Sequence, residues 1–363
     1  MYYSKSNKLS SMICVILLAC FIFIEAKANY KVDFSEDGKI LKKFSGFYVT
    51  EYTIPNGVTT IAPNAFTAPR LQNVLIPNTV INIGDFAFYF CSKLYITIPS
   101  SVKYIGESAF CGVRQIKSEN DNFVVDSQGV LIDKKNKKIL YAPPTLYGNY
   151  NIPEGIEIIG AGAFCSLNNL YSVTIPSSVI TIAEGSFMSC KNLEEIKISN
   201  NVINIGRYAF SGCKKLNITI PHSVKNIGES AFCDVRQIKS ENNNFTIDSN
   251  GVLIDKKKKE LLYSPPTLYG SYNIPEGIEV IGAYAFSNNR NLQKVVIPKG
   301  VTRIKSNAFG MCFNLQNVLI PDSVIFIGDR AFNYCINLNS VVIPKKAQIG
   351  KNAFDAKCKI TKK

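Results

Sequence analysis

Histidine is almost absent from this chain of 363 residues, because His222 is the only one. A metal site with two histidine ligands and catalysis by several histidines are therefore excluded. His222 follows an Ile-Pro pair, at a position where other copies of the same motif carry unrelated residues. We expect it in an exposed turn.

Other signatures of chemistry are also missing. The sequence has no Cys-x-x-C pair, no glycine-rich phosphate loop, no nucleophile elbow and no calcium-binding repeat. Adjacent carboxylates such as Glu194 and Glu195 should point apart on a strand, which makes them a poor acid–base pair. We therefore predict a protein that is not an enzyme, with no catalytic residues, no cofactor and no metal site.

A motif of 22 or 23 residues repeats along the chain, and two intervals are longer, at 54 residues. Its cleanest copy runs from Ile320 to Val341 and contains Ile-Pro, then Val, Ile-Gly, Ala-Phe, Leu and Val. The copies open at Ile54, Ile76, Ile98, Ile152, Ile175, Ile198, Ile220, Ile274, Ile297, Ile320 and Ile343. Each holds a phenylalanine at the same point: Phe66, Phe88, Phe110, Phe164, Phe187, Phe210, Phe232, Phe286, Phe309, Phe332 and Phe354. A fixed period in this range indicates a solenoid.

One copy cannot bury enough apolar surface to fold alone, so neighbouring copies must stack and pair their strands in a parallel ladder. The stretch from Leu338 to Ile343 predicts a short strand with Leu338, Val341 and Ile343 inward, ended by a proline that lacks a ladder N–H. The glycine after the second isoleucine is expected to need an unusual backbone angle at a tight corner. It occurs at Gly84, Gly106, Gly160, Gly206, Gly228, Gly282 and Gly328.

The repeat resembles the BspA-like leucine-rich repeats, also described as the Treponema pallidum type, from about Ile54 to Phe354. The resemblance implies a curved, right-handed solenoid and a role in adhesion or surface recognition. It implies no catalytic residues. The predicted fold class is thus a β-rich solenoid, a leucine-rich-repeat stack with a parallel strand ladder, an N-terminal hairpin cap and two hairpin inserts.

Residues 1–28 are predicted to be a secretory signal peptide. Two lysines precede an apolar run at 12–24, and Ala26-Lys27-Ala28 fits the small-x-small cleavage rule. An alternative is a lipoprotein cleavage box at 17–20, which would leave Cys20 lipidated. No hydrophobic tail follows Cys358, so we expect no transmembrane anchor after signal cleavage and a secreted or cell-surface protein.

The remaining chain is assigned to a cap at 29–53 and a solenoid at 54–363. The cap is predicted as a hairpin around Asp37-Gly38. The two long intervals are internal copies offset by 122 residues and carry inserts at 117–151 and 239–273. Each insert predicts a hairpin that continues the stack. Its lysine-rich tip either contacts a ligand or belongs to a structural hairpin and is simply solvated.

Nine of the eleven cysteines follow the signal, and all nine lie close behind a repeat phenylalanine. Positions tied to the repeat indicate core packing. Stacked side chains point in parallel, whereas a disulfide needs β-carbons about 3.8 Å apart. An odd number also cannot pair completely. We therefore expect mostly buried free thiols.

The formal net charge is +14. A basic surface favours anionic partners such as sulfated glycans, but lysine and asparagine at variable positions also keep an apolar stack soluble. The expected partner is a protein or glycan, anionic on the first interpretation, on another cell or in the extracellular matrix. Nucleic acid is not expected, given the export signal.

A binding face follows from strand alternation, because the residue before each Ile-Pro pair should point outward. At the C-terminal end these residues are apolar, namely Val296, Leu319 and Val342, and Lys294 and Asn317 flank them. Such a column marks an interaction site, although valine and leucine also simply suit strands. We predict an adhesin-like protein that binds a macromolecule through its concave strand face; the alternative is a structural envelope or matrix protein without a specific ligand.

Two N-x-S/T sequons, at Asn217 and Asn244, are weak candidates for glycosylation.

Overall fold

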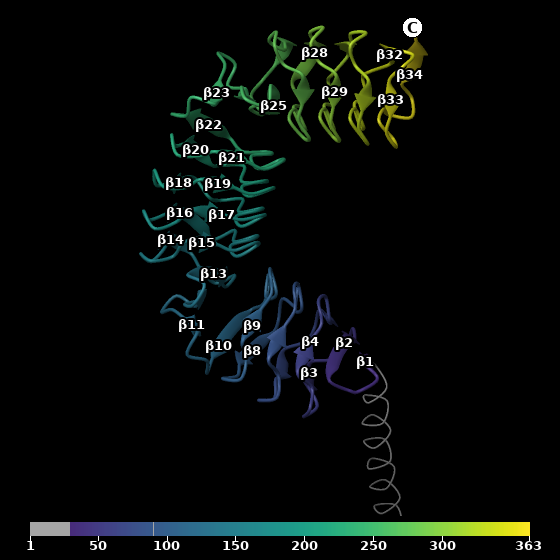
Figure 1. Cartoon of the computed structure of the whole chain (residues 1–363). Coiled ribbons are helices and arrows are strands. Elements are labelled where there is room, and N and C mark those ends of the chain that lie inside the picture. Colours follow the sequence, from purple (N-terminus) through teal and green to yellow (C-terminus); the bar gives the residue numbers. More distant parts are fainter. Residues whose placement is uncertain (1–29, 90) are drawn as a thin grey trace, which may run out of the picture. The chain divides into compact units, whose positions relative to one another are not determined.

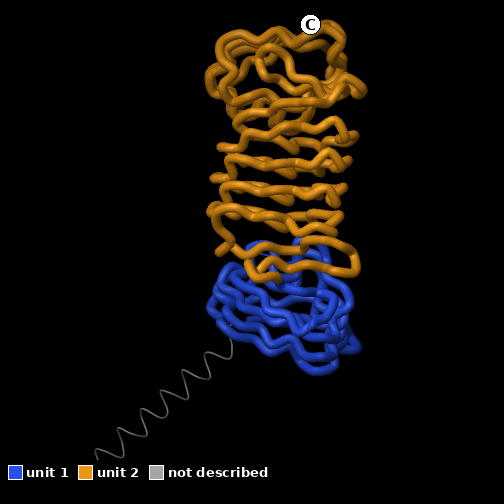
Figure 2. The backbone as a smooth tube through the Cα atoms, turned by 90° about the vertical axis from the view of Figure 1, so that its left-hand side faces the viewer, with its two compact units in different colours: residues 1–125 blue, residues 126–363 orange. Residues whose placement is uncertain are grey.

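The computed structural model describes residues 30–89 and 91–363. The predicted signal peptide and Cys20 lie outside these residues. The described chain forms strands and turns and contains no helix; hence this part offers no helical segment able to cross a membrane. It divides into two compact units, the first ending at Val125 and the second running from Asp126 to Lys363 (Figure 2). Both units are built from the same repeat.

Unit 1 begins with the expected hairpin cap. Strand β1 (Lys31–Phe34) pairs antiparallel with β2 (Ile40–Ser45). The carboxylate of Asp37 accepts hydrogen bonds from the Ser35 hydroxyl and the Lys39 N–H, and Gly38 has a φ of 70°. Strand β2 then pairs in parallel with β4 (Thr60–Ile61) and β5 (Phe66–Thr67), so the cap covers the first turn of the stack.

Each turn of the stack contributes one longer and one shorter strand, and the strands of successive turns pair in parallel. In unit 1 the longer strands are β3 (Glu51–Thr53), β6 (Asn73–Leu75), β8 (Tyr95–Ile98) and β10 (Gln115–Ser118). The shorter ladder continues from β4 to β7 (Asn82–Ile83) and β9 (Tyr104–Ile105), and unit 1 ends with β11 (Phe123–Val125).

Unit 2 repeats this plan (Figure 1). Its longer strands form three separate ladders: β14 (Gly148–Asn151), β16 (Leu170–Thr174), β18 (Glu195–Lys197), β20 (Asn217–Ile220) and β22 (Gln237–Ser240); then β26 (Gly270–Asn273), β28 (Leu292–Val296) and β30 (Asn317–Leu319); then β32 (Ser340–Ile343) and β34 (Lys359–Lys362). Its shorter strands are β15 (Ile158–Ile159), β17 (Thr181–Ile182), β19 (Asn204–Ile205), β21 (Asn226–Ile227), β27 (Val280–Ile281), β29 (Arg303–Ile304), β31 (Phe326–Ile327) and β33 (Gln348–Ile349).

The inserts form hairpins that continue the stack, as predicted. In the first, β12 (Leu131–Asp133) pairs antiparallel with β13 (Lys138–Tyr141), and β13 pairs in parallel with β15. In the second, β23 (Phe245–Ile247), β24 (Leu253–Asp255) and β25 (Glu260–Tyr263) are antiparallel, and β25 pairs in parallel with β27. The second hairpin strand of each insert thus replaces one shorter strand of the ladder.

The repeat phenylalanines form columns through the core of each unit. In unit 2, the ring centroids of Phe309 and Phe332 lie 4.9 Å apart with an interplanar angle of 5°. In unit 1, those of Phe88 and Phe110 lie 5.6 Å apart at 6°. Backbone hydrogen bonds run alongside, such as the one from Phe309 N–H to the Ala331 carbonyl at 2.7 Å. Each turn is therefore held to the next both by its rings and by its backbone.

The glycine after the second isoleucine serves a different purpose from the one expected. None of the seven glycines at this position has a positive φ. A β-carbon on Gly206 would lie 2.6 Å from the carbonyl carbon of Ala183, and one on Gly328 would lie 2.6 Å from the Ser306 nitrogen. Glycine is needed because neighbouring turns approach too closely for a side chain.

The unusual backbone angle falls two residues later, directly before the Ala-Phe (once Ser-Phe) pair. All eleven copies have a positive φ there, although only two have glycine, Gly162 and Gly185. The other nine, with φ between 52° and 59°, are Asn64, Phe86, Ser108, Tyr208, Ser230, Tyr284, Asn307, Arg330 and Asn352. Left-handed geometry costs such residues roughly 1–2 kcal/mol, so the stacked neighbours must hold it in place.

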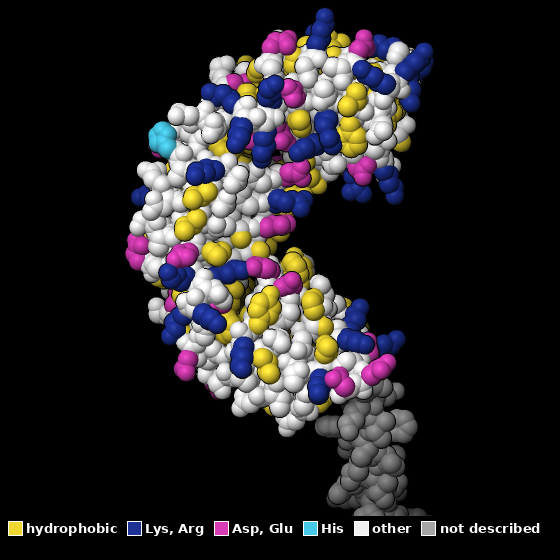
Figure 3. Space-filling model, in the orientation of Figure 1, with side chains coloured by type: hydrophobic (Ala, Val, Ile, Leu, Met, Phe, Trp, Pro, Cys, Tyr) yellow, Lys and Arg dark blue, Asp and Glu magenta, His cyan; other side chains and the backbone are white. Residues whose placement is uncertain are grey.

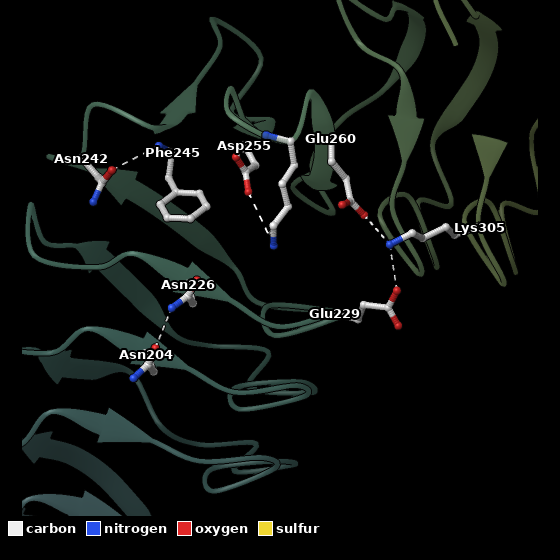
Figure 4. A network of polar contacts seen from close by, with 9 residues as sticks. Asn204, Asn226, Glu229, Asn242, Phe245, Asp255, Glu260 and Lys305 are labelled. Atoms are coloured by element: carbon white, nitrogen blue, oxygen red, sulfur yellow. Dashed lines mark hydrogen bonds and ion pairs between the residues drawn. The ribbon is translucent and has the colours of Figure 1, made fainter. Parts of the chain in front are cut away.

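Unit 2 bends at the second insert (Figure 1). Side chains from the turns that begin at the repeat-glycine position, which we call the glycine turns, contact one another across this insert. The Lys305 Nζ lies 2.8 Å from Oε1 of Glu229 and 2.9 Å from Oε1 of Glu260 (Figure 4). Lys305 stands at the position that is glycine in most copies. Asn288 also donates a hydrogen bond of 3.1 Å to the Asp234 carboxylate across the insert. These contacts join the turns before the insert to those after it.

The charges of this bridge stabilise one another. Burial of its ammonium group lowers the pKa of Lys305, but the hydrogen bonds to Glu229 and Glu260 outweigh burial and leave the pKa raised. The hydrogen bond from Lys305 lowers the pKa of Glu229 below its ordinary value of 4.5.

We expect Phe309→Ala to lower the free energy of unfolding by about 3–5 kcal/mol, because it leaves a cavity in the phenylalanine column. Leu319→Ala, in the same repeat but with the side chain in solvent, is the control and should change it by about 0.5 kcal/mol or less. Urea denaturation followed by circular dichroism measures both. Equal effects of the two substitutions would contradict the column as a source of stability.

Gly206→Ala should lower the free energy of unfolding by about 1–3 kcal/mol, because the added carbon overlaps the backbone of the preceding turn. Ala183→Gly, at the equivalent position one copy earlier, should cost about 1 kcal/mol or less. The same denaturation experiment compares them. A neutral Gly206→Ala would show that the turns are not in such close contact.

Lys305→Met should destabilise unit 2 at pH 7 more than Lys259→Met, which removes the exposed ion pair between Lys259 of the second insert and Glu279. Because the folded-state pKa of Glu229 is depressed, its contribution to stability is present above the unfolded pKa and is lost as the pH falls through the folded pKa. The difference between wild type and Lys305→Met should therefore shrink in urea titrations as the pH falls below 4.5, the ordinary pKa of this carboxyl group. A difference that stays constant while the carboxylates become protonated would contradict the charge bridge.

Candidate functional site

The candidate site is the outward surface of the longer strands, which we call the strand face. Side chains alternate along a strand, so the residues on either side of each buried residue point into solvent. Register then places equivalent residues side by side: Asn73 next to Tyr95, Tyr95 next to Gln115, and Thr97 next to Lys117. The strand face therefore carries parallel rows of side chains spaced by about 4.8 Å.

The predicted apolar column lies on this face. Leu319 is 56% exposed and Val342 is 47% exposed, while Val296 is half-buried. The residues just before them, Val318 and Val341, are buried, so the predicted register is confirmed. Leu319 is thus an apolar side chain that points into solvent, while Val318 fills the core position of the same strand.

The ladder brings some of the predicted residues together and separates others. Val296 lies beside Leu319, and Lys294 lies beside Asn317, in the paired strands β28 and β30. Lys294 and Asn317 are both exposed and flank the column as predicted. Val342 is in β32, which pairs with β34 in a ladder of its own. The column thus consists of Val296 and Leu319, which lie side by side in paired strands, and of Val342 in the following turn.

The strand face of unit 2 is not the inner face of its bend, which corrects the expectation of a concave strand face. Lys305, Glu229 and the other residues that meet across the second insert belong to the glycine turns. The longer strands instead separate there, because β22 and β26 belong to different ladders. Figure 1 accordingly shows β28 toward the outer side of the bend and β29 toward its inner side. The strand face of unit 2 therefore lies on the outer side of the bend.

Two grooves also lie on the strand face, one in each unit. Groove 1 crosses β6, β8 and β10 and has a volume of about 970 Å³. Groove 2 crosses β18, β20 and β22 and has a volume of about 800 Å³. Both lie on the last three longer strands before an insert. Sequence reasoning missed them, although strand alternation does identify their outward residues.

Comparison with protein families identifies the repeat. A sequence profile described as the BspA type leucine rich repeat region matches residues 41–122, 145–252 and 267–363, in six copies. The chain belongs to this family.

Solved structures of bacterial repeat proteins are similar to this chain. A leucine rich cell surface protein from Faecalibacterium prausnitzii A2-165 is 26% identical, with 91% of this chain and 85% of that one covered and a TM-score of 0.52. Leucine-rich repeat proteins from Bacteroides ovatus ATCC 8483 (24% identity, 92% and 89% covered, TM-score 0.39) and Eubacterium ventriosum ATCC 27560 (20% identity, 93% and 94% covered, TM-score 0.41) are also similar. A comparison with curated proteins gave no match.

The cysteines of the BspA-type repeats are buried free thiols, as predicted. None of the nine described cysteines is in a disulfide, and of these nine only Cys233 and Cys358 are partly exposed. The Cys190 thiol donates to the Phe164 carbonyl at 2.9 Å, and three other cysteines repeat this hydrogen bond. Burial raises the pKa of Cys91 to about 11. The Cys91 thiol therefore stays protonated at neutral pH, which suits packing rather than nucleophilic chemistry.

Polar positions outside the column also lie as the repeat predicts. His222 is exposed in its turn. Both sequon asparagines are exposed, Asn217 in β20 within groove 2 and Asn244 directly before β23. Within residues 30–89 and 91–363 no cluster of three or more His, Cys, Asp or Glu side chains is placed to hold a metal ion.

The lysine-rich tips of the inserts are solvated but partly neutralised. Lys137 pairs with Glu157 and Lys259 with Glu279, each at 2.6 Å. On the face drawn in Figure 3, lysines and arginines are interspersed with aspartates and glutamates and do not form one basic patch. Neither observation supports the insert tips as a binding site for a polyanion.

Proposed function

We propose that this BspA-type repeat protein works at the cell surface or outside the cell and binds a macromolecular ligand through the strand face, as an adhesin does. Family membership and the similarity to a leucine rich cell surface protein support the location. The apolar column supports binding. Exposed Leu319 and Val342, rimmed by Lys294 and Asn317, combine an apolar centre with a polar edge, as interaction sites do.

The column contributes to binding because its apolar side chains would leave water only when a partner covers them. Full burial of an exposed valine or leucine gains about 1.5–3 kcal/mol, and covering the part of these side chains that is still exposed gains a share of that. The core does not depend on them, since Val295, Val318 and Val341 fill the inward positions of the same strands. A partner that approaches the outer side of the bend meets them without obstruction from the glycine turns.

The test pairs Leu319→Lys with Val342→Lys, since both side chains are exposed, whereas Val296 is half-buried. The control is Ile325→Lys, an equally exposed apolar residue directly before the shorter strand β31. Binding of the full chain to a panel of immobilised extracellular matrix proteins is measured by surface plasmon resonance. We expect saturable binding by wild type and control and at least about a tenfold weaker affinity for the lysine pair.

Circular dichroism should show all three proteins folded. Unfolding of the lysine pair would contradict the outward register. Unchanged binding by that pair would exclude the column, and absence of saturable binding across the panel would favour the structural role without a specific ligand.

A further inference from the structure

Grooves 1 and 2 are copies of one site. The residues of the two grooves are related by the same offset of 122 that relates the inserts, and every residue of groove 2 except Glu194 has its counterpart in groove 1. The polar positions that are identical in both are Asn78 and Asn200, Thr97 and Thr219, Gln115 and Gln237, Lys117 and Lys239, and Glu119 and Glu241. The chain therefore contains two grooves that share one set of polar side chains, which we call the cradle.

The shared cradle offers hydrogen-bonding groups that the protein itself does not use. Within the described residues, the side chains of Thr97, Gln115, Lys117 and Glu119 make no hydrogen bond or ion pair with the rest of the protein, and their counterparts in groove 2 make none either. Gln115, Lys117 and Glu119 are exposed. Amide and hydroxyl groups both donate and accept, the ammonium donates and the carboxylate accepts. This set complements a ligand rich in hydroxyl groups, which also donate and accept.

Three outward positions differ between the grooves and change their chemistry. Groove 1 has Asn73, Leu75 and Tyr95 where groove 2 has Glu195, Lys197 and Asn217. In groove 1, Tyr95 is 47% exposed, and register places it between Asn73 and Gln115. An exposed aromatic face between two amides offers an apolar platform with polar groups on either side.

The charges of groove 1 cancel. Lys117 is its only cation and Glu119 its only anion, although the chain as a whole carries a net charge of +14. A site for a sulfated or phosphorylated ligand would concentrate cations. A peptide segment that adds to a sheet needs an unpaired strand edge, whereas β8 is paired on both sides. The groove therefore fits an uncharged ligand that has apolar faces and many hydroxyl groups.

We propose that groove 1 binds an uncharged oligosaccharide, with a sugar ring stacked on Tyr95 and its hydroxyl groups bonded to Gln115, Lys117 and the side-chain oxygen of Asn73. The Asn73 Nδ2 itself donates to Oε1 of Glu51 at 3.2 Å. Groove 2 is the same cradle with another specificity. Glu195 and Lys197 of groove 2 occupy the positions of Asn73 and Leu75 in groove 1, and the Lys197 Nζ lies 4.0 Å from Oε1 of Glu195. These two positions are therefore charged in groove 2 and uncharged in groove 1. The proposal deepens the proposed function by naming a ligand class for the strand face, and it uses none of the strands that carry the apolar column.

The test titrates the full chain with uncharged hexasaccharides, namely cellohexaose, maltohexaose, mannohexaose and N-acetylchitohexaose, in a calorimeter, with a heparin hexasaccharide as the charged comparator. We expect one of the four uncharged sugars to bind with a stoichiometry of one. Tyr95→Ala should weaken that binding about tenfold or more, and Tyr95→Phe should retain it within about threefold, since the ring supplies the contact.

The duplicated groove supplies a matched control. The triple variant Glu195→Asn, Lys197→Leu, Asn217→Tyr gives groove 2 the residues of groove 1 at exposed positions, and it should raise the stoichiometry for the same sugar from one to two. Tyr95→Asn, which gives groove 1 the residue of groove 2, should remove the original site. Circular dichroism verifies that each variant is folded.

Absence of binding by all four uncharged sugars, tighter binding of heparin than of any of them, or equal affinity of Tyr95→Ala and wild type would overturn the proposal. A stoichiometry of one in the folded triple variant would also overturn it. The pair Leu319→Lys and Val342→Lys should leave sugar binding unchanged. If sugars do not bind but that pair loses binding to a matrix protein, the glycan site fails while the proposed function stands.

Discussion

The stacking of one turn on the next is the interaction on which the rest of this structure depends. At each glycine turn the backbones approach so closely that Gly206 and Gly328 have no room for a β-carbon. The residue before the Ala-Phe pair is held in a left-handed conformation in every copy. Immediately behind it the phenylalanine rings stack in near-parallel columns. A single turn would have none of these contacts, so the repeat is stable only in an array.

Close stacking also determines what the surface can do. The parallel register places equivalent outward residues of successive turns side by side. The side chains on the longer strands therefore form rows, which offer a ligand several equivalent positions at once. The inserts interrupt these rows. Where β22 and β26 separate, the longer strands end one ladder and begin another, while Lys305 keeps the glycine turns together on the other side. The bend of unit 2 and the outward placement of its strand face have the same cause.

The candidate sites lie on either side of the inserts. Both grooves occupy the last longer strands before an insert, and the apolar column lies in the turns after the second one. The thiols belong to the core instead: seven of the nine described cysteines are buried, and four donate a hydrogen bond to a phenylalanine carbonyl.

The sequence by itself determined the repeat, the solenoid, the hairpin cap, the hairpin inserts, the buried thiols and the outward register of Leu319 and Val342. It could do so because each of these depends on local alternation or on a period shared by all copies. The reason for the repeat glycine was wrong, since a close approach between turns 22 or 23 residues apart leaves no local signal. Only the tertiary structure decided the direction of the bend, the Lys305 bridge and the two grooves. These depend on which turns meet across an insert and on where a ladder ends, and both are contacts between residues far apart in the chain.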